Sequence, residues 1–139
     1  MIPLVEKEIF ASDPAYLTID YPTKGVTAYF SRNFDDSDHE ILDKFLAEKK
    51  ISILNTWSFK NADGSITLTI ASVLKKQETF TFEGRVFHVI WGEFSFILEQ
   101  VNDSLVKCLP YVANQNQKDM ILKYIEHFNT GDIDAHKDS

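Results

Sequence analysis

Two pairs of strand-like runs in the middle of the chain constrain the fold more than any other feature. ISILNTWSFK (residues 51–60) and SITLTIASV (residues 65–73) flank the turn sequence NADG, which suits a tight hairpin. ETFTFEG (residues 78–84) and RVFHVIWG (residues 85–92) form a second pair around a glycine. Apolar and threonine side chains alternate in these runs, as in strands with one buried face and one wet face. The pattern predicts two neighbouring antiparallel hairpins.

Helical patterns lie on both sides of these hairpins. SDHEILDKFLAEKK begins with Ser37 and has Glu40 three residues later, which predicts a capping box at the start of a helix. Its apolar stripe at helical spacing consists of Ile41, Leu42, Phe45 and Leu46. Residues 93–109 and 111–130 predict two closing helices, with Pro110 between them and Gly131 as the C-cap of the second. The apolar faces expected for these two helices are Phe94, Ile97, Leu98, Val101 and Leu105, and then Met120, Ile121, Tyr124, Ile125 and Phe128.

The N-terminal third adds two weaker elements, a short helix at residues 3–10 and a β-branched and aromatic strand at residues 25–31. The whole pattern predicts an α+β fold. We expect an antiparallel, strongly twisted or barrel-like sheet of about five strands, with helices packed outside it. One edge of that sheet has no predicted partner strand, so self-association through it is expected.

The acidic composition limits the partners that the chain can have. The net charge is -7 and the isoelectric point is near 5.0, which disfavours nucleic acid and anionic membranes because phosphate binding needs a basic surface. We see no apolar run of about 20 residues that could span a bilayer and no basic start typical of a signal peptide. We therefore expect a soluble, cytoplasmic protein of one domain, residues 1–139.

Three groups of residues could be read as metal sites. Residues 35–40, DDSDHE, contain four acids, but they lack the glycine and the spacing of a Ca²⁺ loop, and acids are favoured at a helix start. Glu126, His127 and His136 could form a cluster, yet the first two point about 100° apart on a helix. Asp132, Asp134 and His136 are interpreted as a polar tail beyond the helix end.

Other reactive or aromatic residues have structural explanations. Cys108 is the only cysteine and has apolar neighbours, which indicates a buried, inert thiol. Trp57 and Trp91 could line a pocket, although tryptophans on strands are more often core or sheet-face residues. The residues alone predict no catalytic, cofactor-binding or metal-binding position in this chain.

Several segments nevertheless resemble one enzyme family in collinear order. They are GVTAYFS (25–31), LNTWSFKN (54–61), IASV (70–73) and the run from residue 111 to residue 139. Within the last run the matching positions are Ala113, Asn114, Gln117, Met120, Tyr124, Ile125, Phe128, Gly131, Ile133, Ala135, His136 and Lys137. On these residues the chain resembles the dipeptidyl peptidase III family, and the C-terminal run is the most specific part.

The resemblance implies a zinc metallopeptidase, mostly cytosolic, that releases dipeptides from the N-termini of peptides. Such enzymes have two lobes, and their zinc ligands lie on an HExxGH helix and a second glutamate-containing helix of the helical lobe. The segments matched here belong to the other lobe, which contains a five-stranded β-barrel. The sequence contains no HExxGH, so no family catalytic or ligand residue can be placed on it.

Two functional hypotheses follow from this comparison. In the first, the chain is a fragment of the β-barrel lobe that is inactive alone, whose full-length parent binds zinc and peptide substrates. In the second, it is a stand-alone peptide- or protein-binding module that adds a strand to its open sheet edge.

Overall fold

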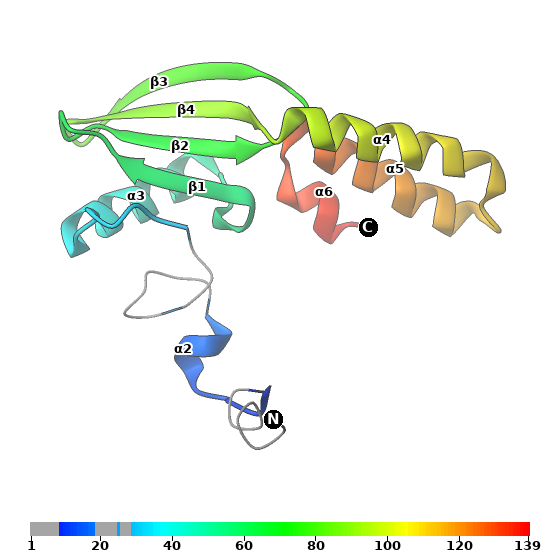
Figure 1. Ribbon diagram of the computed structural model, residues 1–139, viewed down its shortest axis with the longest axis horizontal. Coiled ribbons are helices and arrows are strands. Elements are labelled where there is room, and N and C mark those ends of the chain that lie inside the picture. The colour runs from blue at the N-terminus through cyan, green and yellow to red at the C-terminus, as the bar shows by residue number, and fades with distance from the viewer. Residues whose placement is uncertain (1–8, 19–24, 26–28) are drawn as a thin grey trace.

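The structure, a computed structural model, describes residues 9–18, 25 and 29–139. Its centre is a four-stranded sheet with the order β1-β2-β4-β3 (Figure 1). The strands are β1 (Thr56–Lys60), β2 (Ile66–Ala71), β3 (Lys76–Phe82) and β4 (Arg85–Glu93). The helices are α2 (Pro14–Leu17), α3 (Asp36–Lys49), α4 (Ser95–Cys108), α5 (Gln115–Thr130) and α6 (Ile133–Lys137), with 3-10 turns at Ile53–Asn55 and Leu109–Tyr111. The predicted α+β class is confirmed.

Both predicted hairpins form, but the sheet is not antiparallel throughout. β1 pairs with β2 and β3 pairs with β4 in antiparallel register, whereas β2 and β4 are parallel. The four residues between β2 and β3 lead the chain from the centre of the sheet to its far edge, where β3 lies. Strand β4 then turns back between β3 and β2 and runs parallel to β2. Backbone N–H groups of Val73 and Leu74 in this linker donate to the carbonyl oxygens of Phe128 and Asn129 near the end of α5. These two hydrogen bonds hold the linker against α5. In a simple meander β3 would lie beside β2, whereas here β4 occupies that place and β3 lies outside it.

The barrel-like expectation is wrong for the described residues, because β1 and β3 remain separate edges of an open sheet. The predicted strand at residues 25–31 lies partly outside the described residues. Where it is described, Phe30 forms an isolated parallel bridge to Ser58 of β1, with the Ser58 N–H donating to Tyr29 and the Ser31 N–H donating to Ser58. The expected helix at residues 3–10 also falls almost wholly outside the described residues.

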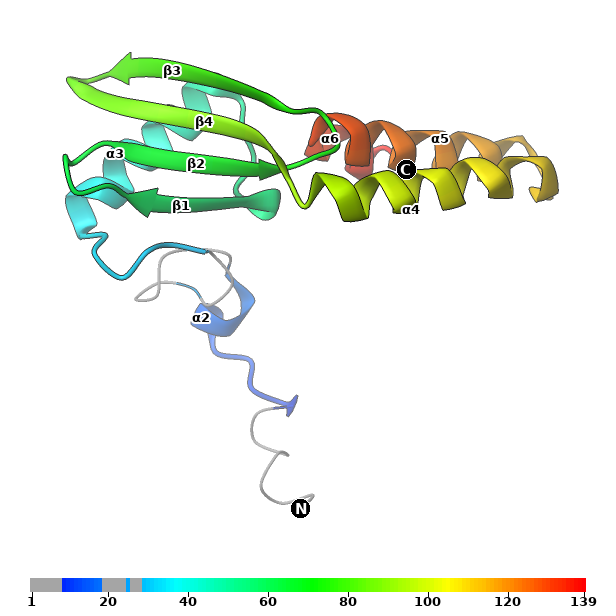
Figure 2. The same ribbon diagram turned by 45° about the horizontal axis from the view of Figure 1, so that its top comes forward.

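The core lies between α3 and one face of the sheet (Figures 1 and 2). The stripe predicted on α3 is confirmed, since Leu42, Phe45 and Leu46 are buried and Ile41 packs against them. Their partners alternate along the central strands: Ile66, Leu68, Ile70, Phe87 and Val89. The Phe45 and Phe87 rings stack with centroids 4.0 Å apart.

The start of α3 differs from the predicted capping box by two residues. Asp35, not Ser37, is the N-cap, and its side chain accepts from the backbone N–H groups of Ser37 and Asp38 at 2.9 and 3.0 Å. Asp38, not Glu40, returns the bond by accepting from the Asp35 N–H at 3.0 Å. Asp35 and Asp38 therefore take the capping roles predicted for Ser37 and Glu40, because a short side chain with an acceptor oxygen can make the same hydrogen bonds.

Helices α4 and α5 lie side by side and extend beyond the end of the sheet (Figures 1 and 2). The side-chain amide of buried Asn102 joins them, donating to Asn129 Oδ1 at 2.9 Å. Their predicted apolar faces are only partly covered by described residues. Ile121 is buried, but Phe94, Ile97 and Met120 are exposed. None of the described helices combines the length and the apolar character needed to cross a membrane.

The C-terminal segment is structured rather than a simple polar tail. Asp132 caps α6 by accepting from the Asp134 N–H at 2.9 Å, and Ile133 and Ala135 are buried. Gly131 ends α5 in the left-handed region with φ 78°, as the sequence predicts.

Candidate functional site

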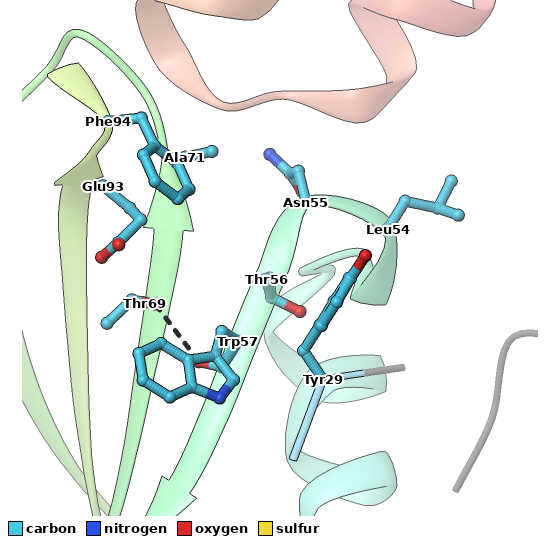
Figure 3. A pocket seen from close by; sticks show the side chains of 9 residues that line it. All are labelled: Tyr29, Leu54, Asn55, Thr56, Trp57, Thr69, Ala71, Glu93 and Phe94. Carbon is cyan, nitrogen blue, oxygen red and sulfur yellow. Dashed lines mark hydrogen bonds between the residues drawn. The ribbon is translucent and has the colours of Figure 1, made fainter. Parts of the chain in front are cut away.

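A cavity of about 450 Å³ lies at the end of the sheet from which α4 departs (Figure 3). That volume is within the usual range for small-ligand sites. Trp57 and Thr69 face each other across β1 and β2, and Ala71 pairs with Glu93 at the ends of β2 and β4. The cavity therefore lies on strand ends, where the backbone is held by the sheet.

Three aromatic side chains come to this cavity from different elements. Trp57 projects from β1, Tyr29 from the segment bridged to β1, and Phe94 from the junction between β4 and α4 (Figure 3). They remain 47%, 65% and 63% exposed in the described structure. Exposed large aromatics that converge on one hollow are typical of a contact or ligand site.

The polar groups of the cavity are few and mostly engaged. The Thr69 hydroxyl donates to the Trp57 carbonyl oxygen at 3.3 Å, and the Asn55 amide donates to the Gly131 carbonyl oxygen at 2.8 Å. Among the lining residues, only Glu93 carries a formal charge. The arrangement is thus a mostly apolar wall with one carboxylate in it.

The sequence indicated only part of this cavity. Trp57 was expected either at a pocket or on a sheet face, and it lies at both. Trp91 packs against the core and also lines a different hollow, beside Ile70 and Gly131. Tyr29, Glu93 and Phe94 were not predicted. The local signal at this position is Gly92, since an isolated glycine in a strand pattern suggests a bulge or a close approach of the backbone.

The acidic run at residues 35–40 is part of the scaffold. Asp38 is fully buried and forms ion pairs with Lys60 Nζ, at 2.7 Å, and with the Arg85 guanidinium. Burial would raise the pKa of Asp38, but hydrogen bonds from Lys60, from the Asp35 backbone and from Arg85 outweigh it and hold the pKa below its usual value. The hydrogen bonds that Lys60 donates to the Asp38 and Asp35 carboxylates raise the pKa of Lys60. The Asp38 carboxylate is therefore paired with two cationic side chains of the fold, Lys60 and Arg85.

The histidine cluster is only partly assembled. His127 and His136 lie with ring centroids 5.1 Å apart, and His127 Nδ1 is 2.8 Å from the Asp132 carbonyl oxygen. Within the ranges that the structure describes, no three His, Cys, Asp or Glu side chains are grouped closely enough to hold a metal ion.

Cys108 does not fit its predicted environment, since its side chain is exposed near the end of α4. Its neighbour Val106 is also 51% exposed, so the apolar run around them is not closed into a core by the described residues. The prediction of a buried thiol is wrong. Apolar residues next to Cys108 in the sequence do not bury its side chain, because this part of α4 faces solvent in the described structure.

Comparison with known proteins identifies the family of the chain. Residues 1–139 match the family described as Peptidase family M49, and the chain belongs to that family. It is 38% identical over 117 residues to dipeptidyl peptidase 3 of Dictyostelium discoideum and 33% identical over 144 residues to dipeptidyl peptidase 3 of Homo sapiens. These matches cover 83% and 93% of this chain. The chain spans 17% and 20% of the two relatives, about a fifth of their length.

The described residues do not fit the zinc that the resemblance implies. Catalytic zinc needs three protein ligands, usually His, Cys, Asp or Glu, and the part of the chain that the structure describes brings no such trio together. No step of zinc chemistry is assigned to these residues.

Proposed function

We propose that this chain is a non-catalytic part of a zinc-dependent dipeptidyl peptidase, contributing to the lobe that faces the peptide substrate. The single observation that carries the proposal is the family match along residues 1–139 together with the small share of each relative that the chain covers. The relatives are named dipeptidyl peptidase 3, which supports release of dipeptides as the activity of the whole enzyme.

The role proposed for the chain is mechanical. The core between α3 and the sheet holds the strand ends and the aromatic cavity in fixed positions. A rigid wall of this kind keeps a bound peptide in one geometry while residues elsewhere react with it. Zinc, peptide substrate and a cytoplasmic location are proposed for the full-length parent and not for this chain by itself.

An activity assay with the purified chain tests the proposal. We expect no release of a fluorogenic group from a dipeptide derivative, with or without added Zn²⁺, at rates above buffer. We also expect Zn²⁺ to leave the melting temperature unchanged, because a ligand stabilises only a protein that binds it. Hydrolysis that a chelator abolishes would contradict the proposal.

Self-association remains a prediction of the open sheet. Tyr29–Ser31 bridges the β1 edge at Ser58, so β3 is the freer edge among described residues. Its exposed Lys76 and Glu78 disfavour close strand pairing. We expect weak, concentration-dependent dimers in sedimentation velocity. A strict monomer at about millimolar concentration would argue against self-association through the sheet edge.

A further inference from the structure

Two histidines meet where the last helix folds back on α5. Gly131 ends α5 in the left-handed region, and the short helix α6 then lies beside the C-terminal part of α5 (Figures 1 and 2). The buried side chains of Ile133 and Ala135 hold α6 in this position. His127 of α5 and His136 of α6 are thereby brought together, with their ring centroids 5.1 Å apart.

The separation of the two rings suits ligation of a single ion. A bond from a metal ion to an imidazole nitrogen is about 2.0–2.1 Å long, so the ring centre lies about 3.2 Å from the ion. Two imidazoles whose bonds to one ion meet at roughly 90–110° therefore have ring centres about 4.5–5.2 Å apart. The observed separation of 5.1 Å lies within this range. An ion can therefore bridge the two rings while α6 keeps its place on α5.

A hydrogen bond fixes which nitrogen of His127 is available as a ligand. Its Nδ1 atom lies 2.8 Å from the carbonyl oxygen of Asp132, and a carbonyl oxygen only accepts, so Nδ1 carries the proton. In the neutral ring the other nitrogen, Nε2, then has an acceptor lone pair. Histidines that ligate metal ions usually donate their other ring N–H to a backbone carbonyl or a carboxylate in the same way. The tautomer and orientation of His127 are thus those of a metal ligand.

The charges around the two rings favour a cation. Lys123 and Lys137 each lie 3.0 Å from a carboxylate of their own helix, whereas Asp132 and Asp138 form no ion pair with the described residues. The pKa of Lys123 is raised, mainly by its hydrogen bond to Glu126 and further by the charges of Asp138 and Asp132. A negative potential of this kind raises the local concentration of cations.

We propose that His127 and His136 together bind one Cu²⁺ ion. Imidazole nitrogens suit several first-row ions, and a given site binds Cu²⁺ more tightly than Ni²⁺ or Zn²⁺. Zn²⁺ usually takes at least three protein ligands, and no third His, Cys, Asp or Glu side chain completes such a group within the described ranges. Cu²⁺ takes a tetragonal arrangement of nitrogen and oxygen ligands, in which water fills the other positions. The site goes beyond the proposed peptidase role, which uses neither histidine.

Titration of the purified chain with CuCl₂, followed by electron paramagnetic resonance, tests the site. The exposed thiol of Cys108 would compete for the ion, so every chain in the titration carries Cys108→Ser. We expect one bound ion per chain, with hyperfine splitting from nitrogen ligands. His127→Gln and His136→Gln should each weaken binding by about tenfold or more, because each removes one of two linked ligands.

His88→Gln is the matched control. It removes a histidine of β4 that is hydrogen-bonded to Thr79 and lies outside the pair, so binding should stay unchanged. Equal weakening by His88→Gln, or weakening by only one of the two paired variants, would indicate an adventitious ion only and overturn the proposal. So would the absence of binding, or Zn²⁺ binding as tightly as Cu²⁺.

Paramagnetic broadening locates the ion in a chain that keeps all its histidines, so this test stands even if a histidine variant fails to fold. Cu²⁺ broadens the amide resonances of the residues nearest to it. We expect the resonances of His127, Asp132 and His136 to disappear first. Broadening centred on any other part of the chain would place the ion elsewhere and contradict the proposal.

Discussion

At the scale of single residues, Gly131 joins two parts of the fold. Its positive φ of 78° ends α5, and an added Cβ would lie 2.7 Å from Ile70 Cγ2 and 3.0 Å from the Ala71 carbonyl oxygen. The sequence predicts the first role, because glycine after a helical pattern is a helix end. It does not predict the second, because the close approach of α5 to β2 depends on tertiary packing.

Gly131→Ala is therefore expected to destabilise more than a glycine substitution that meets only the backbone constraint. Gly64→Ala is the matched control, since φ is 84° there and nothing lies within 4 Å of the added Cβ. We expect Gly64→Ala to lower the free energy of unfolding by about 1 kcal/mol, from left-handed strain alone. Gly131→Ala should lose about 1–3 kcal/mol more through the steric clash. Equal losses in urea denaturation would show that α5 does not approach β2 so closely.

Asp38 makes a second prediction at this scale. Asp38→Asn should lower the free energy of unfolding by about 3 kcal/mol at neutral pH, because it leaves Lys60 and Arg85 without their buried counter-ion. Asp36→Asn, an exposed change in the same helical turn, should lose less than about 1 kcal/mol. Urea denaturation of both variants measures the difference, and similar losses would mean that the ion pairs do not stabilise the fold.

The pH dependence of stability follows from the same carboxylate. The folded pKa of Asp38 lies below its ordinary value of 3.8, so its contribution is present above that pH and is lost as the pH falls below it. Stability of the unaltered chain should therefore decline below about pH 4. Asp38→Asn should show a shallower decline over the same range. A decline as steep as that of the unaltered chain would assign the pH dependence to other groups.

At the scale of elements, sequence patterns predicted which helices and strands form, whereas tertiary packing determines how those elements are arranged. The helical stripe at 41–46 is correct because α3 buries one face in the core. The apolar face predicted at 66–70 is also buried, but the wet face predicted for Thr67 and Thr69 is wrong, because both side chains are buried as well. The parallel pairing of β2 with β4 was missed, since hairpin signals fix neighbours within a hairpin but not between hairpins. The burial predicted for α4 and α5 was too extensive because their apolar faces point partly to solvent in the described structure.

Phe45 tests the packing of α3 on the sheet. Its ring is fully buried and stacks on Phe87 with an interplanar angle of 9°. Phe45→Ala should lower the free energy of unfolding by about 3–5 kcal/mol, through lost burial and the cavity left behind. Phe96→Ala is the control, because this ring on α4 is 72% exposed and should cost less than about 0.5 kcal/mol. Comparable losses from the two changes would place the core elsewhere.

At the scale of the whole molecule, the fold presents more apolar surface than its own described elements cover. Helices α4 and α5 extend beyond one end of the sheet (Figure 1), and the aromatic cavity lies at that end because Glu93 and Phe94, at the junction of β4 and α4, line it. The chain spans about a fifth of its relatives, and the family match runs along all of it. A scaffold that presents apolar surface to other parts of a peptidase fits these observations together.

The sequence predicted this role only through resemblance. Composition and motifs indicated an acidic α+β domain, and the absence of HExxGH from residues 1–139 left no catalytic residue to place. The cavity was not predictable from the pattern because Tyr29, Trp57 and Glu93 come from separate elements that only the folded sheet brings together. Long-range proximity of this kind carries no local signal.

Sequencing the transcript through and beyond the codon for Ser139 tests whether these residues are part of a longer zinc peptidase. We expect the reading frame to continue into a further strand and later to encode an HExxGH helix. The 139 residues would then be one part of a zinc peptidase. A stop codon directly after Ser139 would contradict the proposed role in a larger enzyme and leave peptide binding by the chain itself as the function to test.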